Sequence, residues 1–229
     1  MRCDSRGFNP SYVGLRGDIL DLIPDNVGKV LDFGCSVGRL GEELKHRFRA
    51  EVVGIEFDEQ MAKAAKGKLD RVILGDIDKI NLEDQLVPDY FDCIIFGDIL
   101  EHLTNPWEVL KKATTFLNKD GTVVASIPNV RHYTVVLNLL FRGYWPYRER
   151  GLHDRTHLRF FTLRNIQELF QYANLRIVRL KRNHRIIERQ HPHNRLSRYL
   201  AFAPFKEFLT FQYLIVAKKG QQESSRFQH

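Results

Sequence analysis

Cysteine is scarce in this sequence. The 229 residues include three cysteines, Cys3, Cys35 and Cys93, which is an odd number spread far apart. No two of them have the C-x-x-C spacing of a zinc or redox motif. The sequence therefore excludes a disulfide framework and a cysteine metal site, and it indicates a reducing compartment. A chain of this length needs no covalent support, because it buries roughly 70% of its unfolded surface.

Long hydrophobic runs are missing as well. The first ten residues, MRCDSRGFNP, have no apolar core, so we expect no secretory signal there. The most apolar helix-like stretch, Val135 to Phe141, is far too short for a bilayer span, which takes about 20 residues. The sequence predicts a cytoplasmic protein, with a place at the inner membrane surface as an alternative suggested by its charge.

The charge is positive and unevenly distributed. The formal net charge is +7, and residues 176–198, RIVRLKRNHRIIERQHPHNRLSR, are dense in Arg, Lys and His. A basic face favours phosphates, nucleic acid or an anionic membrane surface. A solvated basic loop explains the same stretch, and the sequence alone leaves both interpretations open.

Apolar segments alternate with helical patterns in the first half of the chain. Leu40, Leu44 and Phe48, for example, recur at i, i+4 and i+8, which is one face of a helix. The expected strands of this half are Lys29–Phe33, Glu51–Ile55, Val72–Leu74, Phe91–Phe96 and Thr122–Ile127. Such alternation predicts an α/β fold, in which right-handed crossovers build a parallel sheet with helices on both faces.

The second half should close the sheet. Leu175–Leu180 and Phe208–Ala217 are expected to be two strands antiparallel to each other, which makes seven in all. We expect a single domain over residues 1–229, with no linker. Its special segments would be an N-terminal helix or lid (1–27), a substrate-side insertion (129–161), a basic insertion (181–207) and a frayed tail (219–229).

The turn after the first strand is rich in glycine. In open α/β sheets, ligands bind beyond the carboxyl ends of the strands. The sequence VLDFGCSVGRLG has Ser36 and Arg39 where a G-x-G-x-x-G dinucleotide fingerprint starting at Gly34 needs glycine. It also lacks the G-K-[ST] ending of a P-loop. The looser D-x-G-x-x-x-G spacing suits a ligand without a pyrophosphate, held by backbone approach and a carboxylate.

Four segments in this order resemble the class I S-adenosylmethionine-dependent methyltransferases. They are VLDFGCSVGRLG, VVGIEFDEQM, VILGDID and FDCIIFGDILEHLTNPWEVL. The resemblance extends from about residue 9 to about residue 218 and implies a Rossmann-like methyltransferase fold. The family usually has a second glycine where Ser36 stands. A Cβ there would crowd a close backbone approach, so we expect a shifted loop that still binds the cofactor.

The resemblance implies roles in cofactor binding for residues near the carboxyl ends of the strands and in the N-terminal segment. Glu56 would accept both ribose hydroxyls, Asp76 and the Ile77 backbone would read the adenine, and Arg16 would pair with the cofactor carboxylate. A surface position is the alternative for Arg16. The expected cofactor contacts are Arg16, Asp32, Gly34, Cys35, Ser36, Gly38, Glu56, Phe57, Asp76, Ile77, Gly97, Asp98 and His102 of this sequence.

The segment after the fifth strand is expected to face the acceptor. GYWPYRERGLHDRTHLRFFT resembles a bacterial branch of the family associated with surface-polysaccharide and glycan methylation. Aromatic rings can stack on sugar faces while polar groups bind hydroxyls. The expected substrate contacts are Asn129, Arg131, Tyr144, Trp145, Tyr147 and Arg155.

Methyl transfer to a hydroxyl needs a proton acceptor. The candidates are His157 and Asp154, with His132 in reserve because it directly follows the fifth strand. A packed, structural histidine is the alternative for His157. The spacing His153-Asp154-x-x-His157 also suggests a metal, but no third ligand is evident in the sequence, so we predict no metal site.

These features predict an S-adenosylmethionine-dependent O-methyltransferase that acts on a sugar, a nucleotide sugar or a lipid-linked glycan. Methylation of nucleic acid or of another small molecule is one alternative. The strand-four ending FGDILEH argues against nucleic acid, because it lacks the Asn/Asp-Pro-Pro-aromatic clamp of base-amino methylases. A non-catalytic cofactor-binding scaffold is the other alternative, and Ser36 is its best support.

Overall fold

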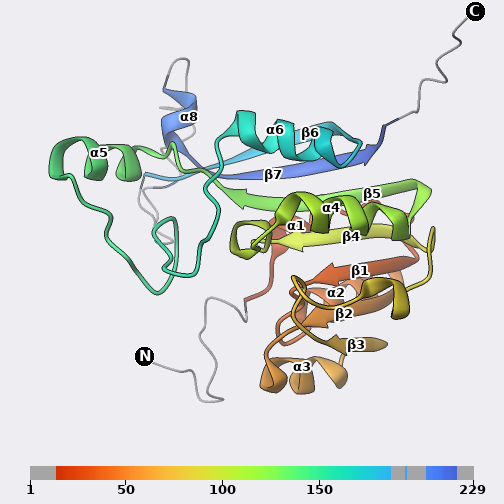
Figure 1. Ribbon diagram of the computed structural model, residues 1–229. Helices are drawn as coiled ribbons and strands as arrows, with labels where there is room; N and C mark the ends of the chain where they lie inside the picture. The colour runs from red at the N-terminus through yellow and green to blue at the C-terminus, as the bar shows by residue number, and fades with distance from the viewer. Residues whose placement is uncertain (1–13, 187–193, 195–204, 221–229) are drawn as a thin grey trace, which may run out of the picture.

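The computed structural model describes residues 14–186, 194 and 205–220. Most of the predicted tail, much of the basic stretch and the start of the N-terminal segment lie outside these residues. Where the chain is described, a central sheet carries helices on both faces (Figure 1).

Seven strands form one sheet in the order β3-β2-β1-β4-β5-β7-β6. The strands are β1 (Lys29–Phe33), β2 (Glu51–Glu56), β3 (Arg71–Leu74), β4 (Phe91–Gly97), β5 (Leu117–Pro128), β6 (Leu175–His184) and β7 (Thr210–Lys219). The first five pair in parallel, whereas β7 is antiparallel to both of its neighbours, β5 and β6. The predicted α/β fold with a reversed C-terminal strand is confirmed.

The helices described are α1 (Gly17–Leu20), α2 (Arg39–Phe48), α3 (Glu59–Lys66), α4 (Pro106–Phe116), α5 (Tyr133–Arg142), α6 (Leu163–Tyr172) and α8 (Lys206–Leu209), with 3₁₀ turns η1 (Leu82–Asp84) and η2 (Leu100–His102). Three of the described helices, α3, α4 and α6, begin at a residue whose side chain caps the helix. Asp58 accepts from the Met61 backbone, and Thr162 and Asn165 form a capping box.

Two apolar layers hold the sheet in place. On one face, residues such as Leu110 of α4 and Leu169 of α6 pack on β4 and β5. On the other face, Ile19 of α1 and Leu44 of α2 pack on β1 and β2. Because a parallel sheet is covered on both faces, its ligand site is confined to one edge, the carboxyl ends of the strands.

Several strand boundaries differ from the sequence prediction, and β6, for example, ends at His184 and not at Leu180. The last strand begins at Thr210 and not at Phe208, because the short helix α8 precedes it. β5 begins at Leu117 and not at Thr122, and in its first part the Asn118 side chain accepts from the Asp120 backbone and the strand register shifts.

The substrate-side insertion leaves the sheet after β5. It contains α5 and a cover loop that returns to α6, and α5 projects away from the sheet at one end of the molecule (Figure 1). Among the described residues, no helix has the length and apolar character required to cross a bilayer.

Candidate active site

The glycine-rich loop between β1 and α2 is anchored to the end of β2. The backbone N–H groups of Gly34 and Cys35 both donate to the Ile55 carbonyl, at 2.8 and 3.0 Å. Gly34 and Gly38 have positive φ values of 73° and 75°, where glycine carries no Cβ penalty. A Cβ on Gly34 would lie 2.1 Å from Ile99 Cδ1, so no larger residue fits beneath Ile99.

Ser36 is held in the same left-handed conformation, with φ = 51°. Its backbone N–H donates to Glu56 Oε2 at 2.8 Å, and its hydroxyl lies 3.6 Å from Met61 Sδ. The predicted steric problem therefore takes the form of backbone strain, because a residue with a Cβ occupies a position that favours glycine.

Glu56, at the end of β2, is buried and organises the turn around it. Its Oε1 accepts from the backbone N–H groups of Phe57 and Asp58, both at 3.0 Å, while Oε2 accepts from Ser36. Burial raises the pKa of Glu56, although these backbone donors oppose the shift. A carboxylate has about four lone-pair sites and three are used here, so Oε2 keeps one site for a ribose hydroxyl. The Phe57 ring is exposed beside it.

Asp32 is an almost fully buried acid in β1. Burial, followed by the charge of Glu56, raises the pKa of Asp32 to about 7, while Arg16 opposes the shift. An acid with such a pKa is poised to ionise when a cation arrives. This suits the predicted place of Asp32 beneath the amino-acid end of the cofactor.

Asp76 and Ile77 follow β3 on the outer side of the sheet. Asp76 is half exposed, forms an ion pair with Lys79 at 2.7 Å and accepts from the Asp78 backbone. Ile77 packs on the core beneath. An adenine amino group would have to compete with Lys79 for the Asp76 carboxylate.

Asp98, after β4, lies at the centre of a polar network. Arg16 Nη1 is 2.6 Å from Asp98 Oδ2, and Arg16 also contacts Asp18 and Ser126. Ser126 of β5 and Gln212 of β7 donate to Asp98 Oδ1. The Arg16 side chain is therefore partly buried, and it is held by an ion pair with Asp98. A Cβ on Gly97 would lie 3.0 Å from Ile19 Cδ1, so α1 packs close to this strand end.

A cluster of Glu101, His102 and His157 lies directly after this network. His157 Nε2 is 4.0 Å from Glu101 Oε1, and the rings of His102 and His157 meet edge to face at 4.7 Å. The backbone N–H groups of Leu158 and Arg159 both donate to the Glu101 carbonyl, which fixes the cover loop on η2. We call these three residues the Glu101 cluster.

The Glu101 cluster is electrostatically unusual. Burial, with a smaller contribution from His102, lowers the pKa of His157 to about 4, so its imidazole is neutral at pH 7. Burial and the nearby Asp98 raise the pKa of Glu101 well above its usual range. Glu101 Oε2 is buried and has no hydrogen-bond partner among the described residues. One ligand atom from each residue lies within 4.8 Å of the others, so the cluster could hold a metal ion.

This set differs from the metal spacing weighed in the sequence. His153 is buried against the Trp145 ring at 5.0 Å and is not part of the cluster. Of the residues described, only Glu101, His102 and His157 come together in this way. Glu101 and His102 lie 56 and 55 positions before His157 in the sequence, too far away for the spacing to indicate the cluster.

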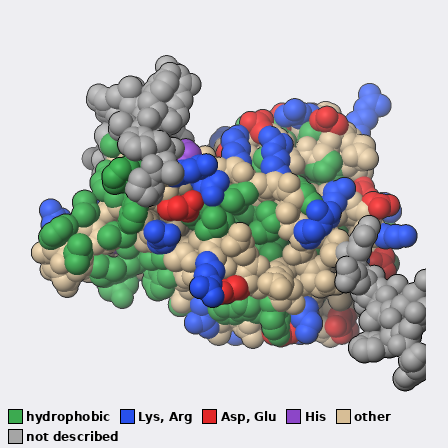
Figure 2. All heavy atoms as spheres, turned by 90° about the horizontal axis from the view of Figure 1, so that it is seen from above, with side chains coloured by type: hydrophobic (Ala, Val, Ile, Leu, Met, Phe, Trp, Pro, Cys, Tyr) green, Lys and Arg blue, Asp and Glu red, His purple; other side chains and the backbone are tan. Residues whose placement is uncertain are grey.

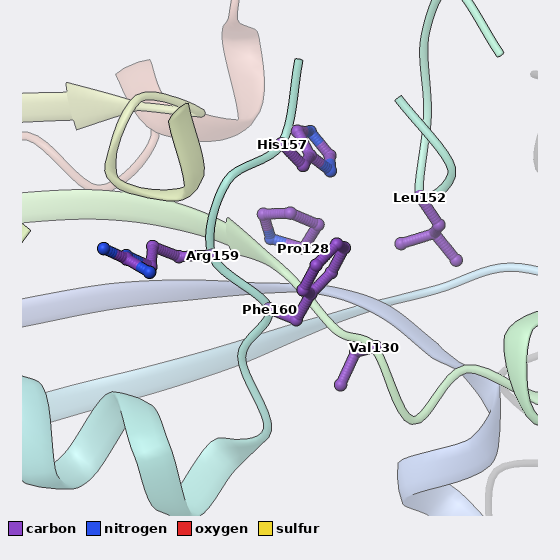
Figure 3. A pocket seen from close by; sticks show the side chains of 6 residues that line it. All are labelled: Pro128, Val130, Leu152, His157, Arg159 and Phe160. Carbon is purple, nitrogen blue, oxygen red and sulfur yellow. The ribbon is translucent and has the colours of Figure 1, made fainter. Parts of the chain in front are cut away.

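A small pocket adjoins the cluster. It is lined by Pro128, Val130, Leu152, His157, Arg159 and Phe160. Figure 3 shows the His157 ring, Pro128 and Phe160 grouped together with Leu152 opposite, while Arg159 points to the other side. Its walls are apolar apart from His157 and Arg159, and it has room for about one water molecule, so it marks the space beside His157 without enclosing a ligand.

The cover loop places other predicted residues around this pocket. Asp154 accepts from the Thr156 backbone at 2.9 Å and from its hydroxyl at 2.7 Å, which shapes the loop. Trp145 packs on Phe160 and has a buried Nε1 without a hydrogen-bond partner among the described residues. Tyr144 and Tyr147 are exposed, and Arg155 forms an ion pair with Glu149 at 2.8 Å.

Three predicted residues have structural partners. Asn129 is fully buried, and its amide donates to the carbonyls of Glu207 and Thr210, both at 2.8 Å. His132 has both ring nitrogens engaged, by Thr134 and by the Arg185 carbonyl, each at 2.9 Å. Arg131 lies over the Phe208 ring. These contacts connect the insertion to α8 and to the end of β6. Because both ring nitrogens of His132 are hydrogen-bonded, we do not propose it as the base.

Sequence reasoning missed four polar residues of the site: Glu101, Ser126, Arg159 and Gln212. For Glu101 a signal existed, because the segment DILEHL places an acid between apolar residues. Ser126 and Gln212 had none, since their partner Asp98 is 28 and 114 positions away.

The fold and this strand edge define an S-adenosylmethionine-dependent methyltransferase. The chain belongs to the family described as a methyltransferase domain, whose model matches residues 13–180. Acids at the ends of β1 and β2, with a left-handed glycine loop between them, fit the cofactor: Glu56 offers a carboxylate for a diol, and Asp32 offers one for an ammonium group.

The similar proteins agree with this family. A ubiquinone biosynthesis O-methyltransferase of Neisseria meningitidis is 30% identical over 150 residues, which is 61% of each chain. One of Dechloromonas aromatica is 30% identical over 166 residues, or 70% of each chain. The chain therefore matches about three fifths of the Neisseria relative's length. A methyltransferase structure from Archaeoglobus fulgidus has a TM-score of 0.65 at 20% identity and covers 89% of this chain and 92% of its own.

Proposed function

We propose that this protein transfers the methyl group of S-adenosylmethionine to a hydroxyl group and that the Glu101 cluster removes the hydroxyl proton. The observation that supports this is the buried pair His157 and Glu101, 4.0 Å apart beside the pocket. The cofactor supplies a methyl group on a sulfonium. When bound, it would give up that methyl group to the acceptor oxygen and leave as the neutral thioether S-adenosylhomocysteine, and the Glu101 cluster would take the proton from the acceptor hydroxyl.

The residues of this chain have separate tasks in that reaction. Glu56 and the loop at Gly34–Gly38 hold the cofactor, while Asp98, fixed by Arg16, Ser126 and Gln212, lies at the strand end towards the cluster. The cover loop, attached to Glu101 through Leu158 and Arg159, keeps His157 in place and limits access of water.

The acceptor we favour is a phenolic hydroxyl. A neutral imidazole whose conjugate acid has a pKa of about 4 is a weak base. It suits a phenol, with a pKa of about 10, better than a sugar alcohol, which is much less acidic. Pro128, Val130 and Phe160 make the surface beside His157 apolar, which suits an aromatic ring better than a sugar. The names of the relatives, ubiquinone biosynthesis O-methyltransferases, agree with such an acceptor.

The glycan predicted from the sequence stays a second candidate. The exposed rings of Tyr144 and Tyr147 lie on the cover loop and are suited to stack on sugar faces. A panel of small phenols, methyl glycosides and nucleotide sugars, assayed with labelled cofactor, separates the two. Transfer to phenols alone supports our choice, and transfer to sugars alone supports the glycan.

The cluster is tested by His157→Ala. General-base catalysis contributes roughly 10²–10⁴-fold, so kcat should fall by that factor while binding of S-adenosylhomocysteine is unchanged. His46→Ala, at an exposed position on α2, is the matched control. If kcat of the His157 variant stays within a few-fold of the unmodified protein, the cluster is not what removes the proton.

A further inference from the structure

The exposed apolar surface of this protein is concentrated in one place. Of the fifteen exposed large hydrophobic side chains in the described part of the chain, six lie between residues 137 and 147. They are Leu137, Leu139, Leu140, Phe141, Tyr144 and Tyr147. In Figure 2 they form part of the hydrophobic area over α5, at the left of the molecule.

The second half of helix α5 does not pack on the hydrophobic core. Val135 is its only fully buried residue, whereas Leu140 and Phe141 are 70% and 75% exposed. Gly143, with φ = 56°, ends the helix in a left-handed turn and reverses the chain. The apolar residues are consecutive near this end, so they surround the helix tip and do not form a single stripe.

The same segment is basic. Residues 129–155 contain five arginines and two acids, Glu149 and Asp154. Asp154 is buried, and Arg142 directly follows the apolar tip, where its side chain reaches back to Asn138. An apolar tip with tyrosine and arginine at its base is the arrangement expected for a helix at the boundary of a bilayer.

We propose that the tip of α5, with Tyr144, Tyr147 and Arg142, docks this protein on an anionic lipid membrane. The tip would enter the acyl boundary, while the tyrosine and arginine side chains would lie among the headgroups. The apolar tip is complementary to the acyl chains of a lipid surface, and the positive arginines are complementary to its negative charge.

A second copy of the chain fits this surface less well. A ten-residue helix is about 15 Å long and about 10 Å wide, which gives a side surface of roughly 470 Å². A stable protein interface buries about 800 Å² per partner, and the arginines at the base of the tip would repel their symmetry mates. We therefore choose the membrane as the occupant.

The position of the tip beside the pocket also favours a membrane as the partner, and this point depends on the proposed function. Val135 packs with Leu152, and Val130 and Trp145 pack against them, so α5 and the pocket share one small apolar cluster. An acceptor held in the membrane would meet the pocket next to the docking surface. The docking itself requires neither cofactor nor acceptor.

Co-sedimentation with lipid vesicles tests the proposal on the full chain. The probes are vesicles of phosphatidylcholine alone and of phosphatidylcholine mixed with phosphatidylglycerol. We expect binding to the mixed vesicles, at least tenfold weaker binding for the triple variant Leu139→Ser, Leu140→Ser and Phe141→Ser, and weaker binding for Arg142→Glu. Circular dichroism and binding of S-adenosylhomocysteine show that the variants remain folded.

Two controls make the test specific. Val87→Ser removes an exposed apolar side chain elsewhere, and Arg176→Glu with Arg179→Glu reverses charge on the basic strand β6. Both should bind vesicles like the unmodified protein. The proposal is overturned if the triple variant binds normally, if only the β6 variant loses binding, or if the unmodified protein ignores vesicles and forms a dimer that the triple variant lacks. Vesicle binding without methyl transfer would contradict the proposed function and still support the docking surface.

Discussion

His157 makes a specific prediction about pH. Reasoning from the sequence expects kcat to rise through a histidine ionisation between about 6 and 8. Burial, then His102, lowers the pKa of His157 to about 4, so its imidazole is neutral well below pH 6. We expect kcat to change little between pH 8 and about 5 and to fall only as the pH approaches 4. Saturating both substrates and following circular dichroism separates this from unfolding, and a midpoint between 6 and 7 would contradict it.

Asp32 predicts that cofactor binding depends on pH. Its pKa is raised to about 7 by burial and by Glu56, and a bound ammonium group would favour the ionised form. The ionised fraction then grows about tenfold between pH 6 and 8, so the dissociation constant of S-adenosylhomocysteine should fall by about that factor. In Asp32→Asn, calorimetric titration should find weaker binding without this dependence. Glu168→Gln, on the surface of α6, is the control that should keep it.

The Glu101 cluster allows a test with divalent cations. Glu101 Oε2 is buried without a partner in the described chain, and His102 and His157 each offer a nitrogen nearby. A cation there would neutralise the acid and lower the pKa of an acceptor hydroxyl. Because we propose that His157 takes the proton directly, we expect EDTA and added Mg²⁺, Mn²⁺ or Zn²⁺ to leave kcat unchanged. A loss of kcat with EDTA that these ions restore, and that His102→Ala no longer shows, would contradict His157 as the direct base.

At the scale of the element, the loop between β1 and α2 allows a test of Ser36. Its φ of 51° is costly for a residue with a Cβ, and its hydroxyl lies 3.6 Å from Met61 Sδ. Ser36→Gly should raise Tm by about 2–4 °C, which corresponds to roughly 1 kcal/mol in a chain of this size. Its affinity for S-adenosylhomocysteine should be kept or improved.

Arg49 provides a matched control for that loop. It also has a positive φ, 55°, but it lies at the end of α2. Arg49→Gly should raise Tm in the same way and leave cofactor affinity unchanged. A large loss of affinity in Ser36→Gly alone would mean that the Ser36 side chain makes a necessary contact.

Local signals in the sequence predicted the elements better than the site. The strands, the caps at Asp58 and Thr162, and the glycine loop all depend on residues a few positions apart, so the sequence could predict them. The roles expected for Asn129 and His132 assumed that polar groups after β5 face a ligand. Their partners are backbone carbonyls 53 to 81 positions away, and contacts of that kind depend on the folded topology.

The same reasoning explains why the Glu101 cluster was not predicted. His157 was recognised as a candidate, but its neutral form depends on burial and on His102, 55 positions earlier. The sequence analysis did not consider Glu101, which joins His157 only because the cover loop returns over η2. A sequence pattern can indicate which residue types are available, whereas a pKa depends on what encloses them.

At the scale of the molecule, Asp98 connects the N-terminal segment, the middle of the sheet and the C-terminal strand. Arg16, Ser126 and Gln212 all contact its carboxylate, and Gln212 is almost fully buried. Gln212→Glu would place a second carboxylate against Asp98 Oδ1, where the single charge of Arg16 cannot neutralise both. A buried polar group left without a partner costs about 1–3 kcal/mol, and a charged group costs more, so Tm at pH 8 should fall by at least about 2 °C.

The pH dependence of this loss distinguishes charge repulsion from poor packing. Beside Asp98, the new carboxyl would have a folded-state pKa above its unfolded value, so the folded state binds the extra proton at low pH. The destabilisation should therefore be largest at pH 8 and shrink towards pH 5, where that proton is bound. Gln171→Glu, exposed on α6, should leave Tm unchanged at both pH values. An equal loss at pH 8 and pH 5 would mean that Gln212 acts through its shape, and that Asp98 does not couple the C-terminal strand to the site electrostatically.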